Sequence, residues 1–337
     1  MKAIVIRAPG GLDRLEPRDL PDPGQPAAGE IRVAVHASSL NFHDLMVASG
    51  KSPADDGRVP MADGAGVVEA VGAGVTEFKP GDHVVSCFFP QWQDGSAFGG
   101  VGNFRGTPGD GIDGYAVEYA VRPATAFTLA PRGWSHAEAS TITTAGLTAW
   151  RALVGDGQLK AGDVVLTLGT GGVSIIALQI AKAMGAKVIA TSSSDEKLER
   201  LRELGADHVI NYKHTPEWGK AVREFTGGRG VDHVVEVGGP GTLGQSIEAV
   251  RVGGHLSLIG VLTGRQGQVP TSLLMAKQAR LQGLIVGSRR QQQEFVAALE
   301  QTGIRPVIDR TFALAELADA FRFQEAGAHF GKVVVEW

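Results

Sequence analysis

The chain of 337 residues is long enough for two domains or one large one, and its 43% hydrophobic residues supply ample material for a core. A net charge of −4 without any basic cluster argues against nucleic acid or an anionic membrane surface as partner. The single cysteine, Cys87, excludes an internal disulfide and fits a reducing cytoplasm. The apolar run at residues 1–6 is too short for a signal peptide, and no run approaches the ~18 apolar residues of a membrane span.

The N-terminal third has the pattern of a β-rich domain. Short alternating runs between glycine and proline turns predict strands at 31–36, 66–71, 82–87 and 116–121. Residues 86–114 are glycine-rich and also contain Phe88, Phe89, Trp92, Phe98 and Phe104. So long a segment inside a compact domain is usually a functional wall or lid. A structural flap packed on its own aromatic side chains explains it equally well.

From about residue 135 the pattern changes to helices and strands in alternation. A helical segment at 135–154 leads to predicted strands at 163–168, 187–192, 208–211, 231–237, 255–260 and 282–286. Helices are predicted at 173–184, 195–204, 217–225 and 242–250, with Ser194 as the N-cap of the second and Gly205 as its stop. Strands this short and apolar predict a doubly wound parallel sheet, with a ligand crevice at its carboxyl ends.

The C-terminal segment has no further strand–helix alternation. It predicts helices at 291–301 and 314–326 and a closing strand at 332–336. We therefore expect this segment to return to the first domain. The predicted organisation is an α/β fold in which residues 1–125 and 287–337 form a β-rich domain, and residues 126–286 form an inserted Rossmann domain.

A glycine turn follows the strand at 163–168 and opens the next helix. Its residues are Gly169, Thr170, Gly171, Gly172, Val173 and Ser174. Such a turn leaves backbone N–H groups and the positive end of a helix free to hold a pyrophosphate. Ser174 replaces the third glycine of the G-x-G-x-x-G pattern and is small enough for close helix–strand packing. The turn predicts a bound dinucleotide.

The end of the second strand indicates which dinucleotide. An acidic residue there would bind the ribose hydroxyls of NAD, whereas this chain has Ser192 and Ser193, with Lys197 one helical turn farther on. Small hydroxyls and a lysine favour the 2′-phosphate of NADP(H). Asp195 and Glu196 weaken this interpretation, and the serines could instead simply cap the helix while Lys197 is solvated.

Several motifs together resemble the medium-chain dehydrogenase/reductase superfamily over essentially the whole chain. They are Ser39-Leu40-Asn41-Phe42-His43-Asp44, Gly64-Ala65-Gly66-Val67-Val68, Pro80-Gly81-Asp82, Ala145-Gly146-Leu147-Thr148-Ala149-Trp150, the glycine turn, Leu204-Gly205-Ala206-Asp207 and Phe330-Gly331-Lys332-Val333-Val334. The resemblance implies a GroES-like catalytic domain and is strongest to the zinc-free branch that includes quinone oxidoreductases. It also implies dimers paired through the sheet edge at the sixth strand.

This chain differs from the zinc-dependent members of the superfamily at the metal-ligand positions, and these differences indicate the zinc-free branch. Those members place a cysteine where this chain has Asn41, a His-Glu pair where it has Ala62-Asp63, and a cysteine or acid near Thr144. Catalytic zinc needs about three nitrogen, sulfur or carboxylate ligands. The segment that would carry four cysteines for a structural zinc holds only Cys87, which we expect to be a small core residue rather than a reactive thiol. We therefore predict no metal.

Without a metal, the substrate must be polarised by hydrogen-bond donors and protonated by a side chain, a ribose hydroxyl or water. By resemblance Asn41 is the first candidate donor to substrate or ribose. His43 could relay a proton, although a hydrogen-bonded histidine at a helix start is the plainer interpretation. Asp44 matches a family position and is expected to hold the cleft between the domains together.

The resemblance also implies further coenzyme contacts. The backbone at Ile259, Gly260 and Val261 and at Leu284 and Val286 is expected to flank the nicotinamide, with Gly238 under its ribose. Tyr212 resembles family tyrosines near the adenosine phosphate, with ordinary edge packing as the alternative. Ser288 and Lys332 are expected to reach the pyrophosphate or to seal the domain hinge.

The leading hypothesis is an NADPH-dependent, zinc-independent reductase of quinones or α,β-unsaturated carbonyls. An enzymatic alternative is a zinc-independent alcohol dehydrogenase or ketone reductase. A third is an NADPH-binding protein without turnover. The aromatic, glycine-rich residues 86–114 favour an apolar small-molecule substrate as partner, the cysteine content fits the cytoplasm, and the resemblance implies a homodimer.

Overall fold

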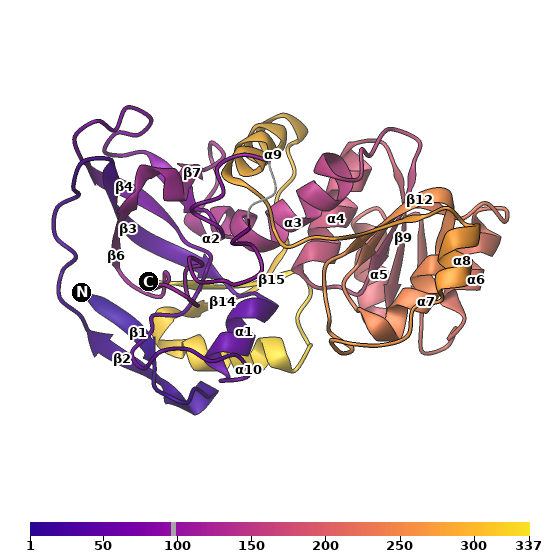
Figure 1. Cartoon of the computed structure of the whole chain (residues 1–337), viewed down its shortest axis with the longest axis horizontal. Helices are drawn as coiled ribbons and strands as arrows, with labels where there is room; N and C mark the ends of the chain where they lie inside the picture. The colour runs from indigo at the N-terminus through magenta and orange to yellow at the C-terminus, as the bar shows by residue number, and fades with distance from the viewer. Residues whose placement is uncertain (96–98) are drawn as a thin grey trace. The chain divides into compact units, whose positions relative to one another are not determined.

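The computed structural model describes residues 1–95 and 99–337, so Phe98 lies outside the described residues. The chain divides into two compact units, whose elements are labelled in Figure 1. The first unit contains Met1–Leu147 and Val286–Trp337, and the second contains Thr148–Ile285. The first unit continues beyond residue 125, where the sequence suggested a boundary, because β7 (Phe127–Leu129) pairs with β5 (His83–Ser86) of its sheet.

The first unit is built on a mainly antiparallel sheet. Its strand order is β14-β15-β3-β4-β5-β7, and β6 also pairs with β3. The remaining elements are β3 (Glu30–Ser39), β4 (Ala65–Val71), β6 (Tyr119–Pro123), β14 (Ile308–Ala313), β15 (Lys332–Glu336), the hairpin β1 (Lys2–Ile6) and β2 (Leu15–Asp19), and the helices α1 (Phe42–Ala48), α2 (His136–Ser140), α9 (Arg289–Thr302) and α10 (Leu317–Glu325). The pairing of β15 with β3 joins the end of the chain to the N-terminal domain.

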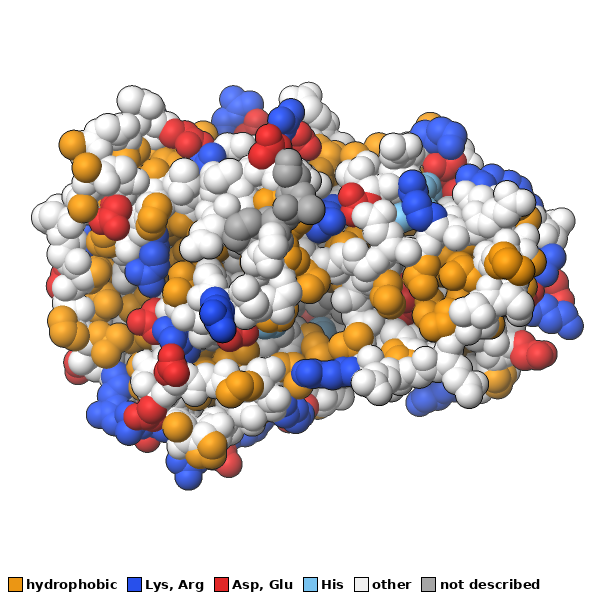
Figure 2. Space-filling model, viewed as in Figure 1, with side chains coloured by type: hydrophobic (Ala, Val, Ile, Leu, Met, Phe, Trp, Pro, Cys, Tyr) orange, Lys and Arg blue, Asp and Glu red, His pale blue; other side chains and the backbone are white. Residues whose placement is uncertain are grey.

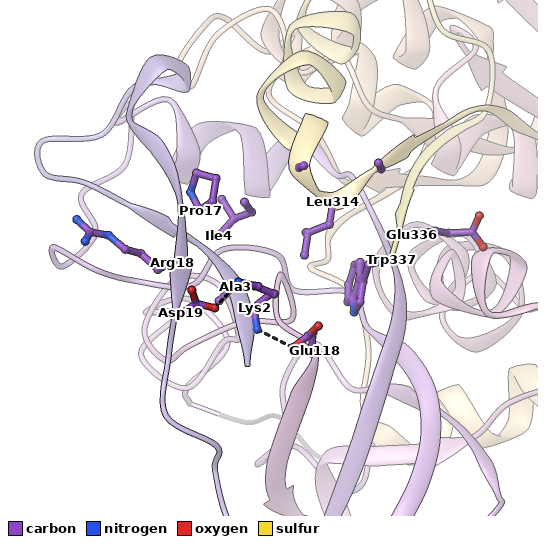
Figure 3. Close-up of a pocket in the computed structure, with 12 residues that line it drawn as sticks. Lys2, Ala3, Ile4, Pro17, Arg18, Asp19, Glu118, Leu314, Glu336 and Trp337 are labelled. Atoms are coloured by element: carbon purple, nitrogen blue, oxygen red, sulfur yellow. Dashed lines mark hydrogen bonds and ion pairs between the residues drawn. The ribbon is translucent and has the colours of Figure 1, made fainter.

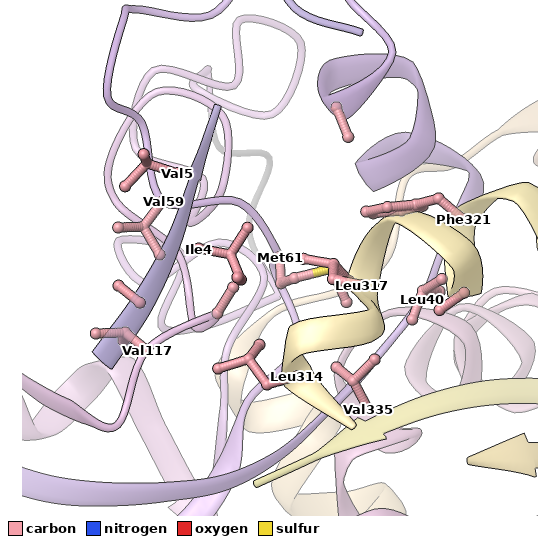
Figure 4. Close-up of a cluster of buried hydrophobic side chains, with 14 of the residues drawn as sticks. Ile4, Val5, Leu40, Val59, Met61, Val117, Leu314, Leu317, Phe321 and Val335 are labelled. Carbon is pink, nitrogen blue, oxygen red and sulfur yellow. The ribbon is translucent and has the colours of Figure 1, made fainter. Parts of the chain in front are cut away.

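An apolar core fixes the helix that carries the candidate catalytic residues. Leu45 and Ala48 of α1 are buried together with Met61, with Phe321 of α10 and with Val335 of β15. Figure 4 shows side chains of this cluster converging from β1, α10 and β15. Each fully buried side chain of this size contributes about 1.5–3 kcal/mol. The position of α1 is therefore set by residues from both ends of the chain.

The second unit contains a parallel sheet with the strand order β10-β9-β8-β11-β12-β13. Its strands are β8 (Val164–Leu168), β9 (Lys187–Ser192), β10 (His208–Asn211), β11 (Val231–Glu236), β12 (Val250–Leu258) and β13 (Arg280–Gly283), and its helices are α4 (Gly172–Ala183), α5 (Asp195–Glu203), α6 (Trp218–Phe225), α7 (Pro240–Ala249) and α8 (Thr271–Ala276). The order reverses between β8 and β11, as in dinucleotide-binding sheets. The expected fold class, a doubly wound parallel sheet inserted in a β-rich domain, is confirmed.

Several expected elements differ in their bounds from the structure; the predicted strand at 255–260, for example, is β12, Val250–Leu258. The predicted strand at 282–286 is wrong at its end, because β13 stops at Gly283 and Val286 has a left-handed backbone with φ of 48°. A left-handed residue cannot continue a strand. The segment expected to be helical at 135–154 is helical, but it contains α2, the short α3 (Leu147–Trp150) and wider, π-type turns at Ile142–Gly146 and Arg151–Gly155.

On the face shown in Figure 2, acidic and basic side chains are interspersed rather than segregated. None of the helices in the described part of the chain combines the length and apolar character needed to cross a membrane.

Candidate active site

The glycine turn lies where the sheet of the second unit reverses its strand order. Gly169 directly follows β8 and adopts a left-handed backbone with φ of 72°. Gly171 is the N-cap of α4, and no atom lies within 4 Å of the place where its Cβ would be. The Ser174 hydroxyl donates to Leu168 O at 2.6 Å, which ties the helix start to the strand end. An open backbone at the start of a twelve-residue helix suits a phosphate group.

Close packing at the ends of β11 and β12 brings three further candidate coenzyme residues together. A Cβ on Gly260 would lie 2.0 Å from Val237 O, so only glycine fits there. The N–H groups of Ile259 and Gly260 both donate to Glu236 O, at 2.8 and 3.2 Å. The Gly238 N–H donates to the Glu236 carboxylate at 2.8 Å. The buried Glu236, which the sequence analysis did not single out, therefore organises this corner of the sheet.

Among the described contacts, no carboxylate side chain bonds to Ser192 at the end of β9. The Ser192 hydroxyl accepts from Ser194 N at 3.2 Å, and Tyr212 N donates to Ser192 O at 3.1 Å, so the ends of β9 and β10 are adjacent. Tyr212 itself is 41% exposed. Asp195 accepts a hydrogen bond of 2.6 Å from the Asn211 side chain, which directs that carboxylate toward β10. Ser193 and Lys197 are both half-buried.

The remaining candidate coenzyme residues fall in both units. Leu284 is buried and donates from its N–H to Leu258 O at 3.0 Å within the second unit. Val261 follows β12 and is exposed. Val286 and Ser288 belong to the first unit, where Ser288 caps α9 by accepting from Gln291 N at 3.3 Å.

The candidate catalytic residues lie at the first turn of α1. Asn41 is its N-cap, and Asp44, three residues on, accepts from the backbone N–H of Asn41 at 2.9 Å. The second carboxylate oxygen of Asp44 accepts from Ala62 N at 2.8 Å. This reciprocal cap satisfies donors that a helix start would otherwise leave unpaired. Asp44 therefore fixes α1 against the segment that leads into β4.

The side chain of Asn41 is fully engaged within the first unit. Its amide nitrogen donates to Asp63 Oδ2 at 2.9 Å and to Asp44 Oδ2 at 3.0 Å. Its oxygen accepts from the ammonium of Lys332 at 2.6 Å, and the same ammonium donates to Leu40 O at 2.6 Å. In this arrangement the amide of Asn41 orients a buried cluster. Its expected role as a donor to substrate or ribose stays a prediction.

The cluster of Asn41, Asp44, Asp63 and Lys332 contains two carboxyl groups and one ammonium group. Burial raises the pKa of Asp63 to about 6, and the charge of Asp44 adds to this, while Lys332 at 3.9 Å opposes it. Burial likewise raises the pKa of Asp44 and lowers that of Lys332. The Asp63 carboxylate also accepts hydrogen bonds of 2.6 Å from both the Ser39 and the Thr144 hydroxyl.

His43 is the candidate catalytic residue whose side chain is partly accessible, at 21% exposure. Its Nε2 lies 3.1 Å from Asp110 Oδ2. Its ring contacts Phe104, with centroids 4.6 Å apart, and Phe88, with centroids 5.5 Å apart. Two aromatic side chains of 86–114 thus contact His43, and Cys87 of the same segment is buried, with a pKa raised by burial to about 12.

A separate hollow of about 400 Å³ lies between the β1–β2 hairpin and the last strand. Figure 3 shows Ile4, Leu314 and Trp337 along it, with Lys2 and Glu118 at one side. None of the candidate catalytic residues lines it. It is therefore distinct from the cluster around Asn41.

Sequence reasoning did not identify three residues that shape the site. Lys332 had been assigned to the pyrophosphate or the hinge, although a lysine that opens an apolar closing strand is itself a signal of a buried partner. Asp63 had been considered only as an incomplete metal ligand. Asp110 carried no signal, because its relation to His43 depends on the fold of a long loop.

Comparison with known proteins supports the resemblance. The family of zinc-binding dehydrogenases matches residues 172–302, and the GroES-like domain of alcohol dehydrogenases matches residues 27–132. A zinc-type alcohol dehydrogenase-like protein of Schizosaccharomyces pombe is 42% identical, over 100% of this chain and 99% of its own length. The chain belongs to the medium-chain dehydrogenase/reductase superfamily. It is an NAD(P)-dependent oxidoreductase of that superfamily.

Solved structures of the superfamily share the whole fold. An NAD-dependent alcohol dehydrogenase has a TM-score of 0.90 at 36% identity and 100% coverage of both chains. A quinone oxidoreductase of Pseudomonas syringae pv. tomato has a TM-score of 0.82 at 29% identity, covering 100% of this chain and 99% of its own. The 2-octenoyl-CoA carboxylase reductase CinF, in complex with NADP and 2-octenoyl-CoA, has a TM-score of 0.89 at 27% identity, covering 99% and 87%.

The zinc-type name of the relative requires a test of the donor set in this chain. Asn41, Asp63 and Thr144 meet in the cluster, but together they offer one carboxylate, one amide and one hydroxyl. The ammonium of Lys332 already contacts Asn41 Oδ1 and would repel a second cation there. No group of three or more metal-ligating side chains occurs among residues 1–95 and 99–337. These residues do not fit a catalytic zinc.

Proposed function

We propose that this member of the superfamily reduces α,β-unsaturated carbonyl compounds or quinones with NADPH and without zinc. The main support for a reaction without zinc is the 2.6 Å contact between Lys332 Nζ and Asn41 Oδ1. This contact places a side-chain cation in the cluster of Asn41, Asp44, Asp63 and Lys332, and the other three side chains do not make up a zinc site. The substrate class is supported by the quinone oxidoreductase and by the 2-octenoyl-CoA carboxylase reductase CinF among the related structures.

The preference for NADPH is supported by the second unit. β9 ends at Ser192 and is followed by Ser193, with no acidic residue at either position, and the carboxylate of Asp195 accepts a hydrogen bond from Asn211. Lys197, in the first turn of α5, supplies a positive charge near this strand end. The related CinF structure contains NADP. These features suit a 2′-phosphate, whereas a carboxylate at the strand end would repel it.

We assign proton transfer and the orientation of α1 to residues of the first unit. Bound NADPH supplies a hydride from its nicotinamide ring. His43 is the side chain that we assign to proton transfer, because it is partly accessible and its imidazole can both donate and accept a proton. Asn41, Asp44 and Lys332 are assigned to orientation of α1 rather than to contact with substrate, because their polar atoms already bond to one another.

A simple alcohol/ketone reaction is the second candidate. It is favoured by the names of two relatives, the zinc-type alcohol dehydrogenase-like protein and the NAD-dependent alcohol dehydrogenase. This reaction would change the C=O group and leave a C=C bond intact. The product of one enone therefore separates the two functions.

The experiment offers the purified protein NADPH together with 2-cyclohexenone, 1,4-benzoquinone or cyclohexanone, and identifies each product by gas chromatography–mass spectrometry against standards, because cyclohexanone and the allylic alcohol have the same mass. We expect saturated cyclohexanone from the enone, hydroquinone from the quinone and no cyclohexanol from the ketone. Allylic alcohol from the enone would support the alcohol dehydrogenase function instead. Metal analysis of the same sample should find zinc far below one per chain, and stoichiometric zinc with loss of activity under chelation would refute the zinc-free proposal.

A variant pair tests the coenzyme assignment. Lys197→Ala should lower kcat/KM for NADPH roughly tenfold, equivalent to ~1.4 kcal/mol, and leave that for NADH unchanged. Lys220→Ala, at an exposed position of α6, is the control and should leave both values unchanged. A wild-type preference for NADH would contradict the assignment.

A further inference from the structure

The segment around Asp110 is held against residues 59–62 by backbone hydrogen bonds. The N–H groups of Gly114 and Tyr115 donate to Val59 O and Met61 O, at 2.8 and 2.9 Å. Gly109 adopts φ of 82°, and a Cβ there would lie 2.6 Å from Met61 N. The Asp110 N–H also donates to Thr107 O at 3.2 Å within a tight turn. These contacts fix the backbone that carries Asp110, although it belongs to a long loop.

This turn directs the Asp110 carboxylate at the imidazole of His43. Oδ2 of Asp110 lies 3.1 Å from Nε2 of His43, and both side chains are about one-fifth exposed. Nε2 is buried and has no well-aligned hydrogen bond to any described residue, so Asp110 is positioned to accept a hydrogen bond from Nε2–H once the geometry tightens. Phe88 and Phe104 contact the same ring, which limits its rotation.

The neighbouring carboxylate of Asp44 is already used elsewhere. It accepts from the backbone and side-chain nitrogens of Asn41 and from Ala62 N. It influences His43 through its charge, whereas the contact at the ring nitrogen comes from Asp110. The two acidic residues near His43 therefore have different tasks.

We propose that Asp110 is a positioning residue that holds His43 with Nε2–H toward its carboxylate, and so makes Nδ1 the atom that transfers the proton in the reduction. This inference rests on the proposed function. A carboxylate that orients a histidine selects one of its two neutral tautomers and stabilises the imidazolium that precedes proton transfer.

NADPH would supply the hydride that forms a C–H bond at the β-carbon of the enone, so that NADPH is oxidised and the C=C bond is reduced. The electron pair of the C=C bond moves to the carbonyl oxygen as an enolate. The Nδ1–H bond of imidazolium His43 breaks and its proton passes to the enolate, which leaves neutral His43 with Nε2–H facing Asp110. A proton from water restores the imidazolium.

The kinetic test compares Asp110→Asn with Asp113→Asn. Asp113 lies in the same loop but is half-exposed and contacts Arg58 and Val59 N, so it is the matched control. We expect Asp110→Asn to lower kcat for the enone about 10- to 100-fold with KM nearly unchanged, which is at or below the low end of the ~10²- to 10⁴-fold contribution of general acid–base catalysis because Asp110 acts only through His43. Asp113→Asn should keep the wild-type kcat.

A double variant tests whether Asp110 acts through His43. In a His43→Gln background, Asp110→Asn should cause no further loss, because two residues of one unit are non-additive. A full additional loss in that background, or a wild-type kcat in the single Asp110→Asn variant, would overturn the proposal.

A spectroscopic test does not depend on turnover. In ¹⁵N-histidine-labelled protein, with His43 assigned by its loss in His43→Gln, neutral His43 should be the Nε2–H tautomer in the wild type and a mixture in Asp110→Ala. If no substrate is reduced but this tautomer shift is seen, the proposed function fails and the pairing stands. An unchanged tautomer in Asp110→Ala rejects the pairing, whatever the activity.

Discussion

The ammonium of Lys332, at the start of β15, lies 2.6 Å from the side-chain oxygen of Asn41, the N-cap of α1. The contact is buried, and the two residues are 291 positions apart. It couples the last strand to the first helix and places a positive charge between two buried carboxyl groups. The stability of the fold and the form of the candidate active site therefore depend on the same contact.

Replacement of Lys332 should destabilise the protein strongly. Lys332→Met leaves Asp63 and Asp44 buried without a cation, and loss of one partner from a buried charged group costs about 3–5 kcal/mol. The loss in the free energy of unfolding should be larger at pH 8 than at pH 5. The pKa of Asp63 in the folded protein is about 6, so below it the carboxyl is mostly protonated and needs no cation. Denaturant unfolding at the two pH values measures both effects.

Lys51→Met is the control for that variant, because Lys51 forms an exposed ion pair with Glu325. An exposed pair contributes only about 0–1 kcal/mol. If Lys332→Met lost no more stability than Lys51→Met, the buried contact would have no structural importance.

Three stacked histidines should make the first unit sensitive to acid. His136 stacks on His36 and on His83, with ring centroids 4.7 and 4.9 Å apart. Burial, and then the charges of the other two rings, lower the pKa of His136 from 6.5 to about 4. Because the folded state disfavours the charged ring, its contribution is complete above pH 6.5 and is lost as the pH falls toward 4.

His136→Phe keeps an aromatic ring and removes this titration. Between pH 7 and pH 5 the Tm of the wild type should fall further than that of the variant, by about 2 °C or more. Scanning calorimetry at both pH values makes the comparison. Parallel falls in Tm would show that the histidine stack does not contribute to acid sensitivity.

Gly260 should tolerate no side chain. A Cβ there would clash with Val237 O at 2.0 Å, so Gly260→Ala should force the ends of β11 and β12 apart and cost about 3 kcal/mol. Gly244 in α7 is the control, since no atom lies within 4 Å of its Cβ position. Gly244→Ala should raise stability by ~0.5–1 kcal/mol. Urea unfolding of both variants would detect the opposite signs, and equal effects would contradict the clash.

Cys87 should be inert in the folded protein. Burial raises its pKa to about 12, so only about 10⁻⁴ of it is thiolate at pH 8. A chromogenic disulfide reagent should therefore not label the native protein and should label one thiol per chain in guanidinium chloride. Rapid labelling of the native protein would instead identify an accessible, reactive cysteine.

Local sequence patterns were sufficient for much of the second unit. The alternation of apolar strands and helices predicted the parallel sheet, and Ser194 caps α5 as expected, accepting from Lys197 N at 3.3 Å. Such features depend on residues within one or two helical turns. The left-handed Val286 was not predictable, because its conformation is imposed by the surrounding structure and not by its own preference.

By itself the sequence determined the doubly wound sheet, the glycine turn and the superfamily, since each rests on short-range periodicity and on motifs with fixed spacing. Only the tertiary structure decided that Lys332 contacts Asn41 and that Asp110 faces His43. Buried charges need partners, but any distant residue of opposite polarity can supply one. The fold selects that partner through the packing of the whole unit.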